Sequence, residues 1–254
     1  MIVPEEVWQR YVDLLAKVDK TATEKMAKYI EKHPIENASD IDAWIAYAFG
    51  LSTKYGEAAA ALAAEMYDEI GAAEGEYLDP ADPAATATLD EVARTVAGVH
   101  RDYADAMMVA MAVGRLVKRA GADTMLQNAA RDGAYYAWIP MGDTCAFCLA
   151  IAAEGWKKAY ADAMKDGHAE HIHANCNCNY AIKHKPDTEF ASYKEPLYKR
   201  IFRGVEGDTP KEKVNSVRRM FYEQNKEEIN AQKRAAYQKR QELNSPEAEE
   251  MDVS

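Results

Sequence analysis

The sequence contains few of the features that mark membrane-spanning, secreted or disulfide-rich proteins. Its 254 residues include only four cysteines. No apolar run approaches the roughly 18 residues that a membrane span requires. The first residues, Met-Ile-Val-Pro-Glu-Glu, lack the basic and apolar regions of a secretory signal. We therefore expect a protein that is made and folded in a cytosol and has no membrane partner.

Basic residues are in the minority. The chain has 31 Lys and Arg against 42 Asp and Glu, which gives a formal net charge of −11. A protein this acidic does not coat nucleic acid over its whole surface, so any basic contact surface must be local. Hydrophobic residues make up 48% of the chain, enough for one large or two small cores. We find no internal repeats.

The first 133 residues have a helical pattern. Apolar residues from Trp8 to Ile30 recur at helical spacing, and Pro34 disfavours helix in the residue before it. A second helix is predicted from Ser39 to Gly71 or Gly75, and it is rich in alanine. A loop with two prolines follows at 78–83. This region predicts an elongated helical unit without a catalytic signature.

A third helical segment follows the proline loop. Thr88 is suited to cap a helix that runs on through a methionine-rich apolar stripe, which we interpret as core packing. We expect Gly114 and Gly121 to interrupt this segment, because glycine weakens helices. Asp123 would then cap a further helix that ends at Gly133.

All four cysteines lie in the stretch 138–182, which reads WIPMGDTCAFCLAIAAEGW, a polar spacer and HAEHIHANCNCNYAI. Cys145 and Cys148 are separated by two residues, the usual first half of a zinc site. The second half would come from His173, Cys176 and Cys178. We expect Cys145, Cys148 and Cys176 to bind zinc, with His173 or Cys178 as the fourth ligand.

Two other interpretations of the cysteines remain open. The pairs 145–148 and 176–178 could each form a disulfide, although a reducing cytosol favours metal binding or catalysis. Four buried, unreactive thiols are the other alternative, but these would not be expected to cluster within 34 residues. The zinc hypothesis therefore leads.

The rest of the chain surrounds this stretch. We predict a strand at 135–139, a helix from Cys145 to Glu154 capped by Asp143 or Thr144, and a strand at 177–182. Residues 186–207 have an irregular pattern that suggests an arm, and Thr209-Pro210 opens a last, highly charged helix. The final residues form an acidic tail that we expect to be disordered.

These patterns give a fold class and a domain division. The chain is predicted to be mainly α: an elongated helical region at 1–133, a small α+β zinc-stabilised module at 134–184, and at 185–254 an extended arm, a charged helix and the tail. Because apolar residues thin out along the helix at 210–243, we expect it to project from the body.

Two enzyme classes share parts of the motif. His168-Ala169-Glu170 has the H-x-E of zinc deaminases, but here C-x2-C precedes it and Thr144 stands where those enzymes have proline. His171 and His173 beside cysteines resemble zinc-stabilised HNH nucleases, yet no distinct histidine motif follows apart from His184. We expect no catalytic residues, with an HNH-like nuclease as the main alternative and a deaminase as the lesser one.

The motif also resembles a known family. W-I-P-x-G-D-T-C-A-F-C-x-x-I-A-x-x-G-W followed by H-x-x-C-x-C is similar to the core motif of tailed-phage minor head proteins of the Mu-F-like group. In that motif, His173, Cys176 and Cys178 occupy the closing H-x-x-C-x-C, and Arg131-Asp132-Gly133 is similar in style. The common form has Pro-Asn before the first of these cysteines, whereas this chain has Ala174-Asn175.

The resemblance implies a structural component of the virion. Members of the group enter the head in few copies with the portal, and some are linked to DNA packaging or ejection. It implies the portal and major capsid proteins as partners, and a location in the head interior or at the portal vertex after synthesis in the bacterial host cytoplasm. The basic residues of the last helix make it the expected contact with the portal or packaged DNA.

Overall fold

A computed structural model describes residues 1–254 apart from 38, 104, 142–144, 161–177 and 244–254. The described part is mainly helical with a small sheet region, as predicted. Its helices are α1 (Glu5–Lys32), α2 (Asp40–Glu74), α3 (Leu89–Tyr103), α4 (Ala106–Asp132), α5 (Ala146–Ala152), α6 (Glu195–Gly204) and α7 (Pro210–Leu243). Its strands are β1 (Ile2–Val3), β2 (Tyr135–Ile139), β3 (Lys157–Lys158), β4 (Asn179–Lys183) and β5 (Glu189–Phe190).

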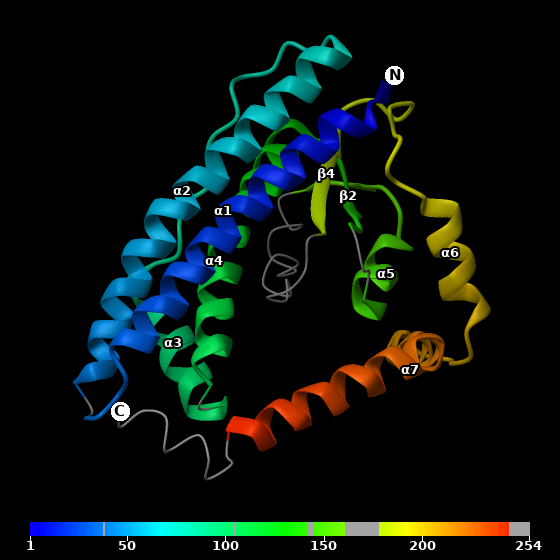
Figure 1. The fold of residues 1–254 in the computed structure, drawn as a ribbon. Coiled ribbons are helices and arrows are strands. Elements are labelled where there is room, and N and C mark those ends of the chain that lie inside the picture. Colours follow the sequence, from blue (N-terminus) through cyan, green and yellow to red (C-terminus); the bar gives the residue numbers. More distant parts are fainter. Residues whose placement is uncertain (38, 104, 142–144, 161–177, 244–254) are drawn as a thin grey trace.

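The long helices α1, α2 and α4 pack side by side, and α3 covers one end of α2 and α4 (Figure 1). α1 ends just before Pro34, and α2 ends at Gly75, whose left-handed backbone (φ 72°) any larger residue would adopt only with strain. Thr88 caps α3 reciprocally with Glu91, because each accepts a hydrogen bond from the other's backbone N–H. These three predictions are confirmed.

The predicted interruption at Gly114 and Gly121 is wrong, because α4 is continuous from Ala106 to Asp132. A Cβ on Gly114 would lie 2.3 Å from both the Asp19 carboxylate and the Thr23 hydroxyl of α1. A Cβ on Gly121 would lie 3.2 Å from the carbonyl oxygen of Ala59 in α2. Both glycines therefore permit close helix packing, which outweighs their low helix propensity.

Two small sheets close the other end of the bundle. β2 is the central strand of an antiparallel sheet with the order β3-β2-β4, and Ile139 pairs with Asn179 at one end of it. The predicted strand at 135–139 is confirmed, and the second strand begins two residues later than predicted. β1 pairs in parallel with β5, which brings the N-terminus beside residues 189–190.

The irregular arm predicted at 186–207 is corrected by the structure, which places β5 and α6 there. Phe190 is buried against Trp8, and Tyr193 and Tyr198 pack on the same core. Pro196 lies in the first turn of α6, where proline is tolerated. The apolar partners of this segment lie far away in the sequence, so its own pattern did not reveal the burial.

One apolar core is shared by the helices and the sheet. It includes Trp8 of α1, Tyr67 of α2, Met125 of α4 and Ile139 and Ile182 of the sheet, all fully buried. This core crosses the boundary predicted between residues 133 and 134. The division of the chain into three units stays a prediction.

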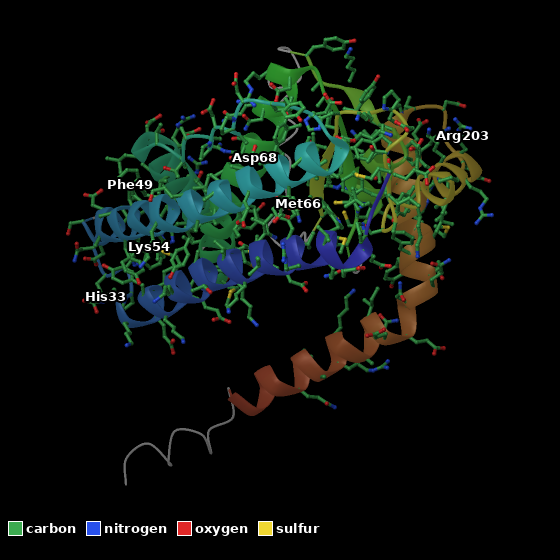
Figure 2. All side chains as sticks on the ribbon, turned by 90° about the horizontal axis from the view of Figure 1, so that it is seen from above. His33, Phe49, Lys54, Met66, Asp68 and Arg203 are labelled. Carbon is green, nitrogen blue, oxygen red and sulfur yellow. The ribbon has the colours of Figure 1, made fainter. Side chains whose placement is uncertain are left out.

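The helix α7 has the predicted bounds and two different halves. Val217 is fully buried in a small cluster with Ala146 and Leu149 of α5, and α6 packs beside them. Beyond Phe221 the described side chains are exposed or half-buried, and Tyr237 is 64% exposed. Seen from above, this distal half lies apart from the long helices α1 and α2 (Figure 2).

Among the described residues, every helix is too short or too polar to span a lipid bilayer.

The packing role of Gly114 predicts opposite effects for two glycine-to-alanine changes. Gly114→Ala should lower the free energy of unfolding by about 1–3 kcal/mol, because the added methyl group overpacks the contact with Asp19 and Thr23. Gly98→Ala in α3 meets no atom within 4 Å and should raise stability by about 0.5–1 kcal/mol. Urea unfolding of both variants measures this. Equal stabilisation by the two changes would show that α1 and α4 do not approach closely at residue 114.

Candidate functional site

The candidate site lies at the end of the sheet where β2 ends and β4 begins. Because Ile139 pairs with Asn179, the segment that leads to Cys145 and the residue that precedes β4 meet at one end of the sheet. Cys178 is 3% exposed, Cys148 is 1% exposed, and half-buried Cys145 packs against the same apolar cluster. The three cysteines that the structure describes thus belong to, or pack against, the core shared by the bundle and the sheet.

Cys145 and Cys148 are held by the start of α5. Cys145 is the N-cap residue of this helix, and its Sγ lies 3.3 Å from the backbone nitrogen of Cys148, which donates to it. The predicted caps Asp143 and Thr144 lie outside the described residues. The two cysteines of the C-x2-C pair therefore share the first turn of α5, a spacing that suits two ligands of one metal ion.

The other candidate ligands, His173 and Cys176, lie outside the described residues, as do His168, Glu170 and His171 of the enzyme alternatives. In the parts of the chain that the structure does describe, no three His, Cys, Asp or Glu side chains are arranged to hold a metal ion. Cys145, Cys148 and Cys178 do not complete such a site by themselves. Zinc binding stays a prediction that depends on the remaining two residues.

Aromatic rings line the sheet beside the cysteines. Tyr180 of β4 packs edge-on against Trp138 of β2, with ring centroids 4.7 Å apart, and against Tyr136 at 5.9 Å. Burial, with a smaller contribution from the neighbouring Tyr136, raises the pKa of Tyr180, so its hydroxyl stays neutral. The WIP segment of the motif thus supplies packing for the cysteine-bearing end of the sheet.

The most connected buried group is Glu74, which the sequence analysis missed. Its side chain is fully buried at the end of α2. One carboxylate oxygen accepts the backbone N–H of His184 at 2.8 Å and lies 2.7 Å from Nδ1 of that histidine. The other accepts the backbone N–H of Lys185 at 3.2 Å and the hydroxyl of Thr188. Nothing in the local sequence distinguishes Glu74 from the other acids of α2.

The protonation of Glu74 follows from these contacts. Burial alone would raise its pKa, but the hydrogen bonds from His184, Thr188 and two backbone N–H groups outweigh it and lower the pKa to about 2. The carboxylate is therefore charged at neutral pH. It joins α2 to the segment after β4, which is more than 100 residues away in the sequence.

A second polar network lies next to Glu74. The Tyr67 hydroxyl lies 2.7 Å from Asp132, and the Tyr67 ring meets His184 edge-on at 5.2 Å. Arg131 binds both oxygens of Asp132 and donates to the backbone carbonyls of Asp79 and Pro80. The Arg131-Asp132-Gly133 sequence thus ends α4 and holds the proline loop against it.

The pKa of Glu74 predicts a pH-dependent contribution to stability. The Glu74→Gln variant should lose about 3 kcal/mol of unfolding free energy at pH 7, the equivalent of the shift from 4.5 to about 2. Because the pKa of Glu74 is lower in the folded state, its carboxylate contributes its full stabilisation above pH 4.5. The difference in unfolding free energy between wild type and Glu74→Gln should therefore be largest there and shrink as the pH falls toward 2. Urea unfolding across this range measures it, with the more exposed Glu76→Gln as control. A loss that does not depend on pH would contradict the charged network.

Comparison with known proteins identifies the chain at the level of family. The family model described as VG15 protein matches residues 2–203, which is most of the chain. No curated protein matches. No solved structure matches either. The matched region contains α1, α2 and α4, both sheets, the cysteine stretch and nearly all of α6, so the chain belongs to the VG15 protein family, a family of viral or phage gene products.

Proposed function

We propose that this protein is a non-enzymatic minor component of the phage head that associates with the portal and acts in head assembly, DNA packaging or ejection. The membership of a phage family and the resemblance of the 138–182 motif to Mu-F-like minor head proteins together support this proposal. The motif is the observation that carries it, because the family alone indicates only a phage protein.

The described polar groups are consistent with a structural role. The carboxylate of Glu74, whose pKa is lowered to about 2, has no exposed side-chain surface and is held by groups of the fold itself. Arg131 is likewise used to fix the proline loop. These networks join elements of the bundle and the sheet and leave their charged groups engaged within the protein.

In this proposal, the distal half of α7 contacts a partner of the protein. The segment 229–240 contains four basic residues and no acidic one, in a chain whose net charge is −11. Lys233 and Arg234 are exposed, as is Tyr237. An acidic partner surface, on the portal or major capsid protein or on packaged DNA, complements such a helix face.

Removal of the distal half of α7 tests this role. A chain that ends at residue 225 keeps Val217 and Phe221, so it should remain folded but enter heads at a fraction of the wild-type copy number. Quantitative mass spectrometry of purified heads, with portal copurification as a second readout, measures this. A chain that lacks only 244–254 is the control. If the chain that ends at residue 225 enters heads at the wild-type copy number and DNA is ejected normally, the distal half of α7 has no such role.

We further propose that Cys145, Cys148 and Cys176 bind a structural zinc ion, with His173 or Cys178 as the fourth ligand. Thiolate and imidazole ligands are those that zinc prefers in structural sites. The arrangement of Cys145 and Cys148 at the start of α5, with Cys178 in the same cluster, fits such a donor set. When bound, zinc would cross-link α5 to the end of the sheet.

The zinc proposal predicts about one zinc per chain in protein purified under reducing conditions. Cys145→Ser should abolish zinc and lower thermal stability, since metal binding contributes folding free energy. His168→Gln is the matched control and should retain the metal. Comparison of His173→Gln with Cys178→Ser identifies the fourth ligand. Wild-type protein without metal, with four titratable thiols, would refute the proposal.

A further inference from the structure

A cleft is formed by β5, the loop before it, the start of α6, and the side chains of Trp156 and Lys183. Its volume is about 450 Å³, within the range of small-molecule sites. Its walls are aromatic: the Trp156 ring packs at 5.4 Å from Phe190 and edge-on at 5.7 Å from Tyr193. The Tyr193 hydroxyl is fixed by its hydrogen bond to the carbonyl of Ala152.

The rim of the cleft is acidic. Asp187, Glu189 and Glu195 all line it. Glu195 is paired with Lys199 of α6. Asp187 and Glu189 are exposed, and within the described part of the chain neither has an ion pair. Both carboxylates act electrostatically on the nearby Lys183 but are not ion-paired to it, so they can also meet a ligand beside the aromatic walls.

Hydrogen bonds to buried groups hold the loop that carries these carboxylates. Thr188, which lies between them, is buried and donates its hydroxyl to Glu74. Lys183 donates to the carbonyls of Pro186 and Thr188 at 2.6 and 2.8 Å. The backbone of the loop at Asp187 and Glu189 is consequently ordered before any ligand arrives, which lowers the entropic cost of binding.

Lys183 shows that the cleft accommodates an ammonium group. It is 6% exposed, and its Nζ lies 4.7 Å from the centre of the Trp156 ring, a cation–π contact. It is the one cation among the lining residues that the structure describes, and two carbonyls and the ring already engage it. With Glu195 paired to Lys199, the described lining sets the carboxylates of Asp187 and Glu189 against the ammonium of Lys183, so its net charge is negative and favours cations over anions.

We propose that this cleft binds an organic cation, an alkylammonium or guanidinium group, between its aromatic walls and the carboxylates of Asp187 and Glu189. Two sources have this chemistry: a free polyamine, or a Lys or Arg side chain on a segment of a partner protein. The proposal does not depend on the zinc site or on α7, and it assigns a ligand class to a surface that the proposed head function does not use.

Isothermal titration calorimetry on the full chain at low ionic strength tests whether the cleft binds an organic cation, with tryptophan fluorescence as a second readout. The probes are spermidine, the capped tripeptide Gly-Arg-Gly and its anionic counterpart Gly-Glu-Gly. At least one cationic probe should bind at one site per chain, and Gly-Glu-Gly should not. The double variant Asp187→Asn/Glu189→Gln should weaken binding about tenfold, through loss of charge-assisted hydrogen bonds.

A matched control separates the cleft from the general acidity of the protein. Glu31→Gln/Glu57→Gln removes two exposed carboxylates elsewhere and should leave the affinity unchanged. Preference for spermidine identifies a free polyamine, and preference for Gly-Arg-Gly identifies a partner side chain. Equal weakening by both double variants, or no saturable binding of either cation, would overturn the proposal.

Discussion

The constraint on which the rest of the structure depends is the burial of the Glu74 carboxylate. An ionised carboxylate is costly to bury unless hydrogen bonds replace the lost water. His184, Lys185 and Thr188 supply these bonds from the segment that follows β4. The end of α2 and the exit of the sheet are therefore fixed to each other, because separating them would leave a buried charge unpaired.

Several other features follow from this link. The fixed end of β4 holds the sheet against the bundle, and at the other end of β4 the residue after Cys178 pairs with Ile139 of β2. The hydrogen bond from Thr188 to Glu74 also holds the loop that lines the aromatic cleft. Cys178 thus precedes β4 and the loop of the cleft follows it, and the polar network of Glu74 holds the second of these two ends.

The sequence predicted those features that local chemistry determines. Pro34 and Gly75 limit helices through the conformations they allow, and Thr88 with Glu91 forms a cap within four residues. Features that depend on distant residues were missed. Gly114 has the same low helix propensity in any context, but its role depends on Asp19 and Thr23 in another helix.

The candidate site shows the same division. The spacing of Cys145 and Cys148 was sufficient to predict a shared turn, and the structure adds Cys178 to their cluster. The buried role of Glu74 could not be predicted, since its partners lie more than 100 residues away and no pattern in α2 marks it. Phe190 and Tyr193 were assigned to an arm because their apolar partners, Trp8 and Trp156, lie in other segments.

The central claim is that the bundle and the sheet form one cooperative unit joined through Glu74 and the shared core. Native-state hydrogen exchange tests it most directly, by comparing the amides of Ala137 and Ala181 in the sheet with those of Ala63 and Val117 in the bundle. All four residues are almost fully buried. The account predicts that the four amides exchange only through global unfolding, with the same free energy. Sheet amides that exchange through a separate opening, at a clearly lower free energy than the bundle amides, would contradict it.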